Sequence, residues 1–258
     1  MPPAWCGSLT TWTTHAVASE ARPVALDLWR AVEAQHVAST MVLVDTVAEQ
    51  AVLERLVESS KPPVPRDVAR LGLHWLLFTP FRYAPPPGGS RFRGPNDPGV
   101  FYGAEQARTA CAEVGYWRWR HLCDTPGIAA MPARPQTVFK VPVSGTAIDL
   151  RQPPFDVDGA QWAHPSDYGD CQALARAARA ALVGLVRYAS VRDSRHGGCG
   201  AVLDAAAFAS RAPTEQQGWF LTVTQTRVVW QRSDPLDPGV FEFSAAGWRE
   251  EAAGWREE

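Results

Sequence analysis

Apolar residues recur at helical spacing in several parts of the chain. The segment around residues 28–32 has this period, and so does the segment after Thr46, where Thr46-Val47-Ala48-Glu49 has the form of a capping box. Prolines from position 62 onward end this second helix. Further helices are expected over 67–78, 104–122 and 167–182. The residues that define the inward faces are Leu28, Ala31 and Val32; Leu53, Leu56 and Val57; Val68, Leu71, Trp75 and Leu76; and Ala107, Ala110, Val114 and Trp117.

Shorter apolar segments between these helices predict strands. QTVFKVPV at 136–143 alternates in the manner of a half-buried strand, and 220–230 is typical of a hairpin that turns near Gln225. Strands are also expected at 99–102, 185–191 and 201–203. Because helices and strands follow one another without regular alternation, the pattern indicates an α+β fold rather than a repeated βαβ unit.

The chain shows no long linker, so we expect one α+β domain. It would occupy residues 66–240, preceded by a helical N-terminal extension over 1–65 and followed by a tail over 241–258. The sequence AAGWREE occurs twice in that tail, at 245–251 and 252–258. Two copies are too few for a repeat fold, and we interpret them as a duplicated surface tail or a cloning remnant.

Composition narrows the class of protein. With 258 residues, 46% of them apolar, the chain can bury a substantial core. A net charge of −2 argues against a nucleic-acid-binding or anionic membrane surface, although only Lys61 and Lys140 among the 25 basic residues are lysines. The five cysteines form no CxxC pair and the histidines have no metal-ligand spacing, so no metal is expected. Without a signal-peptide pattern or a long apolar run, we predict a soluble cytoplasmic protein with no membrane contact.

One turn-rich stretch carries the candidate chemistry. Residues 84–99 contain five prolines and four glycines, and Arg91 lies among them. Tyr102 follows in a predicted strand and Glu113 in a predicted helix, at two equal steps of eleven residues. Glycines let a backbone approach a ligand closely. On spacing alone the three could still be a solvated arginine, a strand-edge tyrosine and a surface glutamate.

As a group, these side chains suit a nucleotide. A guanidinium binds phosphate through two parallel hydrogen bonds, an aromatic ring stacks on a flat heterocycle, and a carboxylate can hold a sugar hydroxyl. A carboxylate also stabilises positive charge that develops on a sugar carbon during bond cleavage. The trio therefore suggests a site for phosphate, base and sugar.

The stretch PFRYAPPPGGSRFRGPNDPGVFYGAEQARTACAEV resembles the RES domain, a family named for arginine, glutamate and serine motif residues. LVRYASVRD, which contains Ser190, is similar to the serine motif, and GGCGAV is similar to the segment that follows it. LVDTVAEQAVLERLVESSKPPVP is similar to the N-terminal part of a longer subgroup. The resemblance extends from about residue 25 to residue 230.

The resemblance implies a mixed-sheet core like that of ADP-ribosyltransferases and an activity on NAD, used as a substrate and without a metal. Arg91 would bind an NAD phosphate, with Arg82 as a second cation, although Arg82, Arg91 and Arg93 are alternatives for the motif arginine. Tyr102 would stack near the nicotinamide or ribose. Glu113 would stabilise the transition state, and Ser190 would hydrogen-bond the ribose or a phosphate.

Family resemblance also implies a biological role. Members are toxins of toxin–antitoxin pairs with Xre-type helix-turn-helix antitoxins, and they degrade NAD by hydrolysis or phosphorolysis. The alternatives are mono-ADP-ribosylation of a cellular protein and a non-catalytic module that binds a nucleotide or a partner. The sequence leaves the ADP-ribose acceptor, the antitoxin and the oligomeric state open, a homodimer being one alternative.

Overall fold

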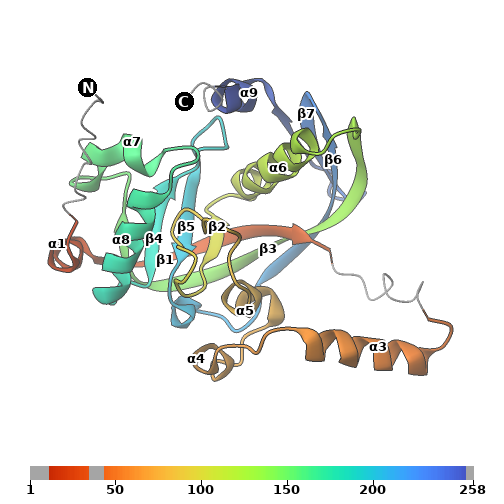
Figure 1. Cartoon of the computed structure of the whole chain (residues 1–258), viewed down its shortest axis with the longest axis horizontal. Coiled ribbons are helices and arrows are strands. Elements are labelled where there is room, and N and C mark those ends of the chain that lie inside the picture. Colours follow the sequence, from red (N-terminus) through yellow and green to blue (C-terminus); the bar gives the residue numbers. More distant parts are fainter. Residues whose placement is uncertain (1–11, 35–43, 254–258) are drawn as a thin grey trace, which may run out of the picture.

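The computed structural model describes residues 12–34 and 44–253 (Figure 1). Its strands are β1 (Arg22–Glu33), β2 (Phe101–Ala104), β3 (Ala130–Asp149), β4 (Leu185–Ala189), β5 (Gly198–Val202), β6 (Glu215–Thr224), β7 (Arg227–Arg232) and β8 (Val240–Ser244). Its helices are α1 (Thr14–Glu20), α3 (Val47–Ser60), α4 (Arg66–Ala69), α5 (Trp75–Arg82), α6 (Ala107–Asp124), α7 (Gly159–Trp162), α8 (Gly169–Ala180) and α9 (Ala246–Ala253), with short 3₁₀ turns at Phe155–Asp158 and Ala205–Ala207.

The strands form one sheet in the order β1-β2-β5-β4-β3-β6-β7-β8, and β1 also pairs with β3. These pairings join β1, β2, β5, β4 and β3 into a closed circuit, with β6, β7 and β8 extending from β3. The β3–β4 pair is parallel and the other pairs are antiparallel. The predicted α+β class with a mixed sheet is confirmed.

Strand β3 organises the sheet because it is twenty residues long. Positions 136–147 pair with β1, positions 130–140 pair with β6, and positions 147–149 pair with β4. The predicted strand at 136–143 is its central part, where Phe139 and Val141 are fully buried. The predicted hairpin is also confirmed, since β6 and β7 are joined at residues 225–226.

Helix α6 lies across the sheet between two cores. Ala110 belongs to the core shared by α8, β4 and β5, whereas Tyr116 and Trp119 pack with β6, β7 and β8. Figure 1 shows α6 and α9 together over β6 and β7, and α1, α7 and α8 grouped beside β4. A third core fills the side of the sheet where α4 and α5 pack. Glu113 of α6 therefore lies where the first two cores meet.

The prediction of a helix around residues 28–32 is wrong, because this segment is part of strand β1. Leu28 packs in the core beside α5 and Ala31 in the core beneath α6, so the strand is buried on both faces. A strand buried on both faces loses the period-two alternation by which strands are recognised. The boundaries proposed for the domain and its extension stay predictions.

The remaining helix predictions were mostly right. Helix α3 has the capping box: the Thr46 hydroxyl accepts from the Glu49 N–H, and the Glu49 carboxylate accepts from the Thr46 N–H. The segment 67–78 instead forms two short helices, because Gly72 takes a left-handed conformation with a φ of 61° between α4 and α5. None of the helices in the described parts of the chain has both the length and the apolar character needed to cross a bilayer.

The first AAGWREE copy is not a surface tail, contrary to our expectation. It contributes to α9, and its Trp248 is only 5% exposed. The indole packs against Tyr116 and Trp119 of α6 with ring-centroid distances of 5.6 Å each. The second copy lies partly outside the described residues.

Candidate active site

Arg91, Tyr102 and Glu113 line one cavity of about 350 Å³. Its walls come from β1, the 84–99 loop, β2, α6, the start of α8 and the end of β4. The residues that line it are Trp29, Arg30, Ala31, Pro86, Gly89, Ser90, Arg91, Tyr102, Gly103, Ala104, Ala110, Glu113, Val114, Trp117, Tyr168, Tyr188 and Arg192. The three side chains proposed from the sequence are thus brought together by the fold.

The 84–99 loop presents Arg91 to the cavity. Gly89 has a φ of 83°, in the left-handed region that favours glycine, and a tight turn follows in which the Ser90 N–H donates to the Arg93 carbonyl over 2.7 Å. The Arg91 guanidinium donates to the Trp162 carbonyl over 2.5 Å and lies 4.9 Å from the centre of the Tyr168 ring. These contacts orient the cation without neutralising its charge.

Tyr102 fixes the same loop from β2. Its hydroxyl accepts a hydrogen bond from the Phe92 N–H over 2.9 Å and is bonded to the Ser90 hydroxyl over 2.8 Å. Because the hydroxyl is occupied by the loop, the ring is the part of Tyr102 available to the cavity. That arrangement suits stacking on a flat ligand.

Glu113 faces the cavity from the middle of α6. Its carboxylate accepts a 2.5 Å hydrogen bond from the Ser190 hydroxyl. Burial raises the pKa of the Glu113 carboxyl above its ordinary value, although the Ser190 hydrogen bond and the charges of Arg91 and Arg192 oppose that rise. The ionised carboxylate is therefore held in a poorly solvated place, where an approaching positive charge is strongly stabilised.

Ser190 itself is 1% exposed and does not line the cavity. Its oxygen accepts from the N–H groups of Arg192 (3.2 Å) and Asp193 (2.9 Å). Since a hydroxyl has one proton and two lone pairs, these two bonds leave the proton to point at Glu113. In this arrangement Ser190 supports the carboxylate, whereas we expected it to contact the ligand.

Two of the three alternatives for the motif arginine lie elsewhere. Arg82, at the end of α5, pairs with Glu58 of α3 over 2.7 Å and also donates to the Pro62 carbonyl. Arg93 donates to the carbonyl of Asp97. Neither side chain lines the cavity, so position supports Arg91 and gives no support to Arg82 as a second cation.

Sequence reasoning missed Arg30 of β1. It donates to the Tyr102 carbonyl, stacks over Phe101 at 4.9 Å, and has a buried Nε without a hydrogen-bond partner. Burial lowers the pKa of Arg30 to about 10, and among the described residues no carboxylate pairs with it. The available signal was a single charge inside the apolar run LWRAV at 28–32.

Two further cavity residues were also missed or misplaced. Arg192 is 2% exposed and stacks 3.7 Å from the centre of the Tyr116 ring. Trp117, expected in the core, is 54% exposed at the cavity, because the stripe of Ala110, Val114 and Trp117 faces this cavity. The lining thus has three arginines and one carboxylate, which favours an anionic ligand with a flat, aromatic part.

Nothing in the described residues forms a group of three or more histidine, cysteine, aspartate or glutamate side chains that could hold a metal ion. Asp193, the acidic residue nearest to Ser190 in sequence, is bonded to Arg108 and Thr109 and does not line the cavity.

Comparison with known proteins identifies the family of the chain. The sequence model of the RES domain matches residues 64–230, which is more than half of the chain, and the protein belongs to the RES domain family. No curated protein matches the chain. Among solved structures, it is similar to a chain of the crystal structure of the M. tuberculosis MbcT–MbcA toxin–antitoxin complex, with 14% identity and a TM-score of 0.44, over 94% of this chain and 98% of that one.

Proposed function

We propose that this protein is an enzyme that consumes NAD by breaking its nicotinamide–ribose bond, and that it acts in the cytoplasm as the toxin of a toxin–antitoxin pair. The observation that carries the proposal is the meeting of Arg91, Tyr102 and Glu113 in one cavity of a RES-domain chain. Each of these groups has a counterpart in the chemistry of NAD: a diphosphate, a flat base and a ribose.

The cations of the cavity would bind the diphosphate. Arg91 has a guanidinium that is oriented by Trp162 and Tyr168, and Arg30 has an unpartnered buried Nε. Guanidinium groups form strong, charge-assisted hydrogen bonds with phosphate oxygens. The rings of Tyr102 and Trp29 offer apolar faces for the nicotinamide. This assignment replaces Arg82 with Arg30 as the second cation.

The bond that breaks joins the nicotinamide nitrogen to C1′ of the ribose. Its electron pair passes to the pyridinium ring, which leaves as neutral nicotinamide, and positive charge develops on the ribose carbon. The Glu113 carboxylate, held by Ser190, would stabilise that charge and hold a ribose hydroxyl. A nucleophile then bonds to C1′ and releases its proton to the solvent. Water gives ADP-ribose, inorganic phosphate gives ADP-ribose phosphorylated at the same carbon, and a protein side chain gives an ADP-ribosylated protein.

Glu113→Gln tests the proposal because it keeps the size of the side chain and removes the charge. We expect nicotinamide release from NAD to fall about a hundredfold or more, since catalytic charge stabilisation of this kind has that magnitude. Glu242→Gln is the matched control, because Glu242 is an exposed residue of β8 that pairs with Arg227 away from the cavity. Normal nicotinamide release by the Glu113→Gln enzyme would contradict the assignment.

The same assay identifies the acceptor. Purified protein with NAD alone, with added phosphate, or with a cell extract distinguishes hydrolysis, phosphorolysis and protein modification. Tight NAD binding by calorimetry without any turnover would favour the non-catalytic alternative.

Membership of the RES family supports the toxin role. The partner would be an Xre-type helix-turn-helix antitoxin, encoded beside this chain, that blocks access to the cavity. Expression should arrest growth and lower cellular NAD, and co-expression of the neighbouring antitoxin should restore both. Growth arrest without any fall in NAD would contradict this role.

A further inference from the structure

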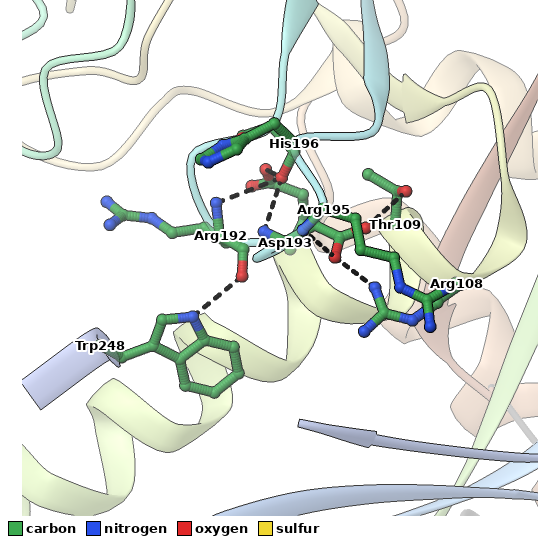
Figure 2. Close-up of polar contacts among 9 residues, drawn as sticks. Arg108, Thr109, Arg192, Asp193, Arg195, His196 and Trp248 are labelled. Carbon is green, nitrogen blue, oxygen red and sulfur yellow. Dashed lines mark hydrogen bonds and ion pairs between the residues drawn. The ribbon is translucent and has the colours of Figure 1, made fainter. Parts of the chain in front are cut away.

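The loop that carries Ser190 is held from outside at several points (Figure 2). The Asp193 carboxylate is bonded to Arg108, and it also accepts a hydrogen bond from the Thr109 hydroxyl over 2.8 Å. Arg192, between Ser190 and Asp193, accepts a hydrogen bond on its backbone carbonyl from the Trp248 indole N–H over 2.9 Å. The last of these contacts comes from α9, near the C-terminal end of the chain.

Trp248 also contacts the helix that carries Glu113. Its ring packs edge-on against Tyr116 and lies 5.6 Å from Trp119, both in α6. It stacks at 6.3 Å with Phe243 of β8. One side chain therefore touches the two elements whose separation sets the hydrogen bond between Ser190 and Glu113.

We propose that Trp248 is a positioning residue, and that α9 is a structural part of the active site. The indole ring is seated on α6, and its N–H holds the Arg192 carbonyl, so it fixes the Ser190 loop at one distance from Glu113. The inference rests on the proposed function, and it extends the site past residue 230, the C-terminal limit of the range matched by the family.

The proposed role has a direct physical reason. The Ser190 oxygen is held by the N–H groups of Arg192 and Asp193, so any shift of Arg192 is passed to the hydroxyl. Hydrogen bonds weaken steeply with distance and misalignment. A small displacement of the loop would leave the cavity able to bind NAD but would misplace the group that supports the catalytic carboxylate.

Trp248→Phe tests the inference by removing the N–H while keeping an aromatic ring. We expect kcat for nicotinamide release to fall about tenfold with little change in KM for NAD, because orientation rather than binding is lost. The acidic limb of the kcat profile should also move to higher pH, since a weaker Ser190 hydrogen bond leaves burial to raise the pKa of Glu113 further.

Trp219→Phe is the matched control. Trp219 is also buried, at 3% exposure, and its indole N–H donates to the Gln217 side chain over 3.0 Å, but it does not line the cavity. We expect its kcat and pH profile to match those of the wild-type protein. If Trp248→Phe fails to fold, benzothienylalanine at position 248 keeps the shape of the indole and replaces only the N–H by sulfur.

The outcomes separate the two proposals. A wild-type protein that does not turn over NAD overturns the proposed function and the role of Trp248 with it. An active wild-type protein, together with a folded Trp248 variant of unchanged kcat and pH profile, overturns the role of Trp248 alone. Equal losses in the Trp248 and Trp219 variants would also overturn it, because they would reflect a general loss of packing.

Discussion

Arg30 is a buried positive charge in the cavity that no negative charge in the described part of the chain balances. Arg30 lines the cavity, and among the described residues no carboxylate pairs with it. A buried cation that lacks an acidic partner is unfavourable in the free protein, because water is removed without a compensating charge. Such a group is retained where a ligand supplies the missing charge.

Arg30→Met should therefore separate stability from binding. We expect the melting temperature to stay close to that of the wild-type protein, since removal of an unpaired buried charge compensates for the lost hydrogen bond to the Tyr102 carbonyl. KM for NAD should rise about tenfold to a hundredfold, the range for one charge-assisted hydrogen bond. Thermal melts and steady-state kinetics check both, and an unchanged KM would remove Arg30 from the ligand site.

The Ser190 hydrogen bond opposes the rise in the pKa of Glu113 that burial causes. In the proposed mechanism the ionised carboxylate is the active form. Because burial raises its pKa, kcat should increase with pH through a midpoint above the ordinary range of a glutamate. The Ser190 hydrogen bond lowers that pKa, and Ser190→Ala should therefore move the midpoint to higher pH. The half-buried Ser210, which donates to the Ala212 carbonyl, provides the control substitution. A midpoint that stays in place in Ser190→Ala would contradict the direction given to the Ser190 proton.

Among the secondary-structure elements, the 84–99 loop has the most demanding backbone. Gly88 and Gly89 both have positive φ values, of 82° and 83°. Open space surrounds the position where a Gly88 side chain would lie, whereas a Cβ on Gly89 would collide with the Arg93 carbonyl oxygen. The two glycines differ, therefore, in steric surroundings and not in backbone conformation.

Alanine substitutions use this difference. Gly88→Ala should cost about 1–2 kcal/mol in the free energy of unfolding, the penalty for a left-handed alanine, and should keep nicotinamide release. Gly89→Ala should cost more and should also reduce NAD turnover, because relief of the collision moves the turn that presents Arg91. Denaturant unfolding and the nicotinamide assay measure the two effects. Equal activity in the two variants would show that the Gly89 turn does not position Arg91.

Sequence patterns predicted the elements whose signals are local. The capping box placed α3, and the proline- and glycine-rich loop placed Arg91 beside β2 and α6. Strand β1 was misread because Leu28 and Ala31 pack on opposite faces of the sheet. Arg30 was missed for the same reason, since its position in the cavity depends on pairing with residues more than a hundred positions away.

In the molecule as a whole, the cavity lies where distant segments meet in the closed circuit of strands. Arg91, Tyr102 and Glu113 were predictable because one continuous stretch carries all three. Arg192 and Tyr188 join them through the pairing of β4 with β3 and β5, and Trp248 joins them through the packing of α9 on α6. Long-range pairing of this kind leaves no periodic signal in the sequence near any of these residues.

The distance in sequence between the cavity walls has a consequence for incomplete polypeptides. Trp29 and Arg192 line the same cavity, and the indole that secures the far wall is at position 248. A polypeptide that stops between residues 192 and 248 contains every residue that lines the cavity but lacks the indole that holds the Arg192 carbonyl. Polypeptides truncated in this way would therefore lack the contact that positions the groups of the proposed active site.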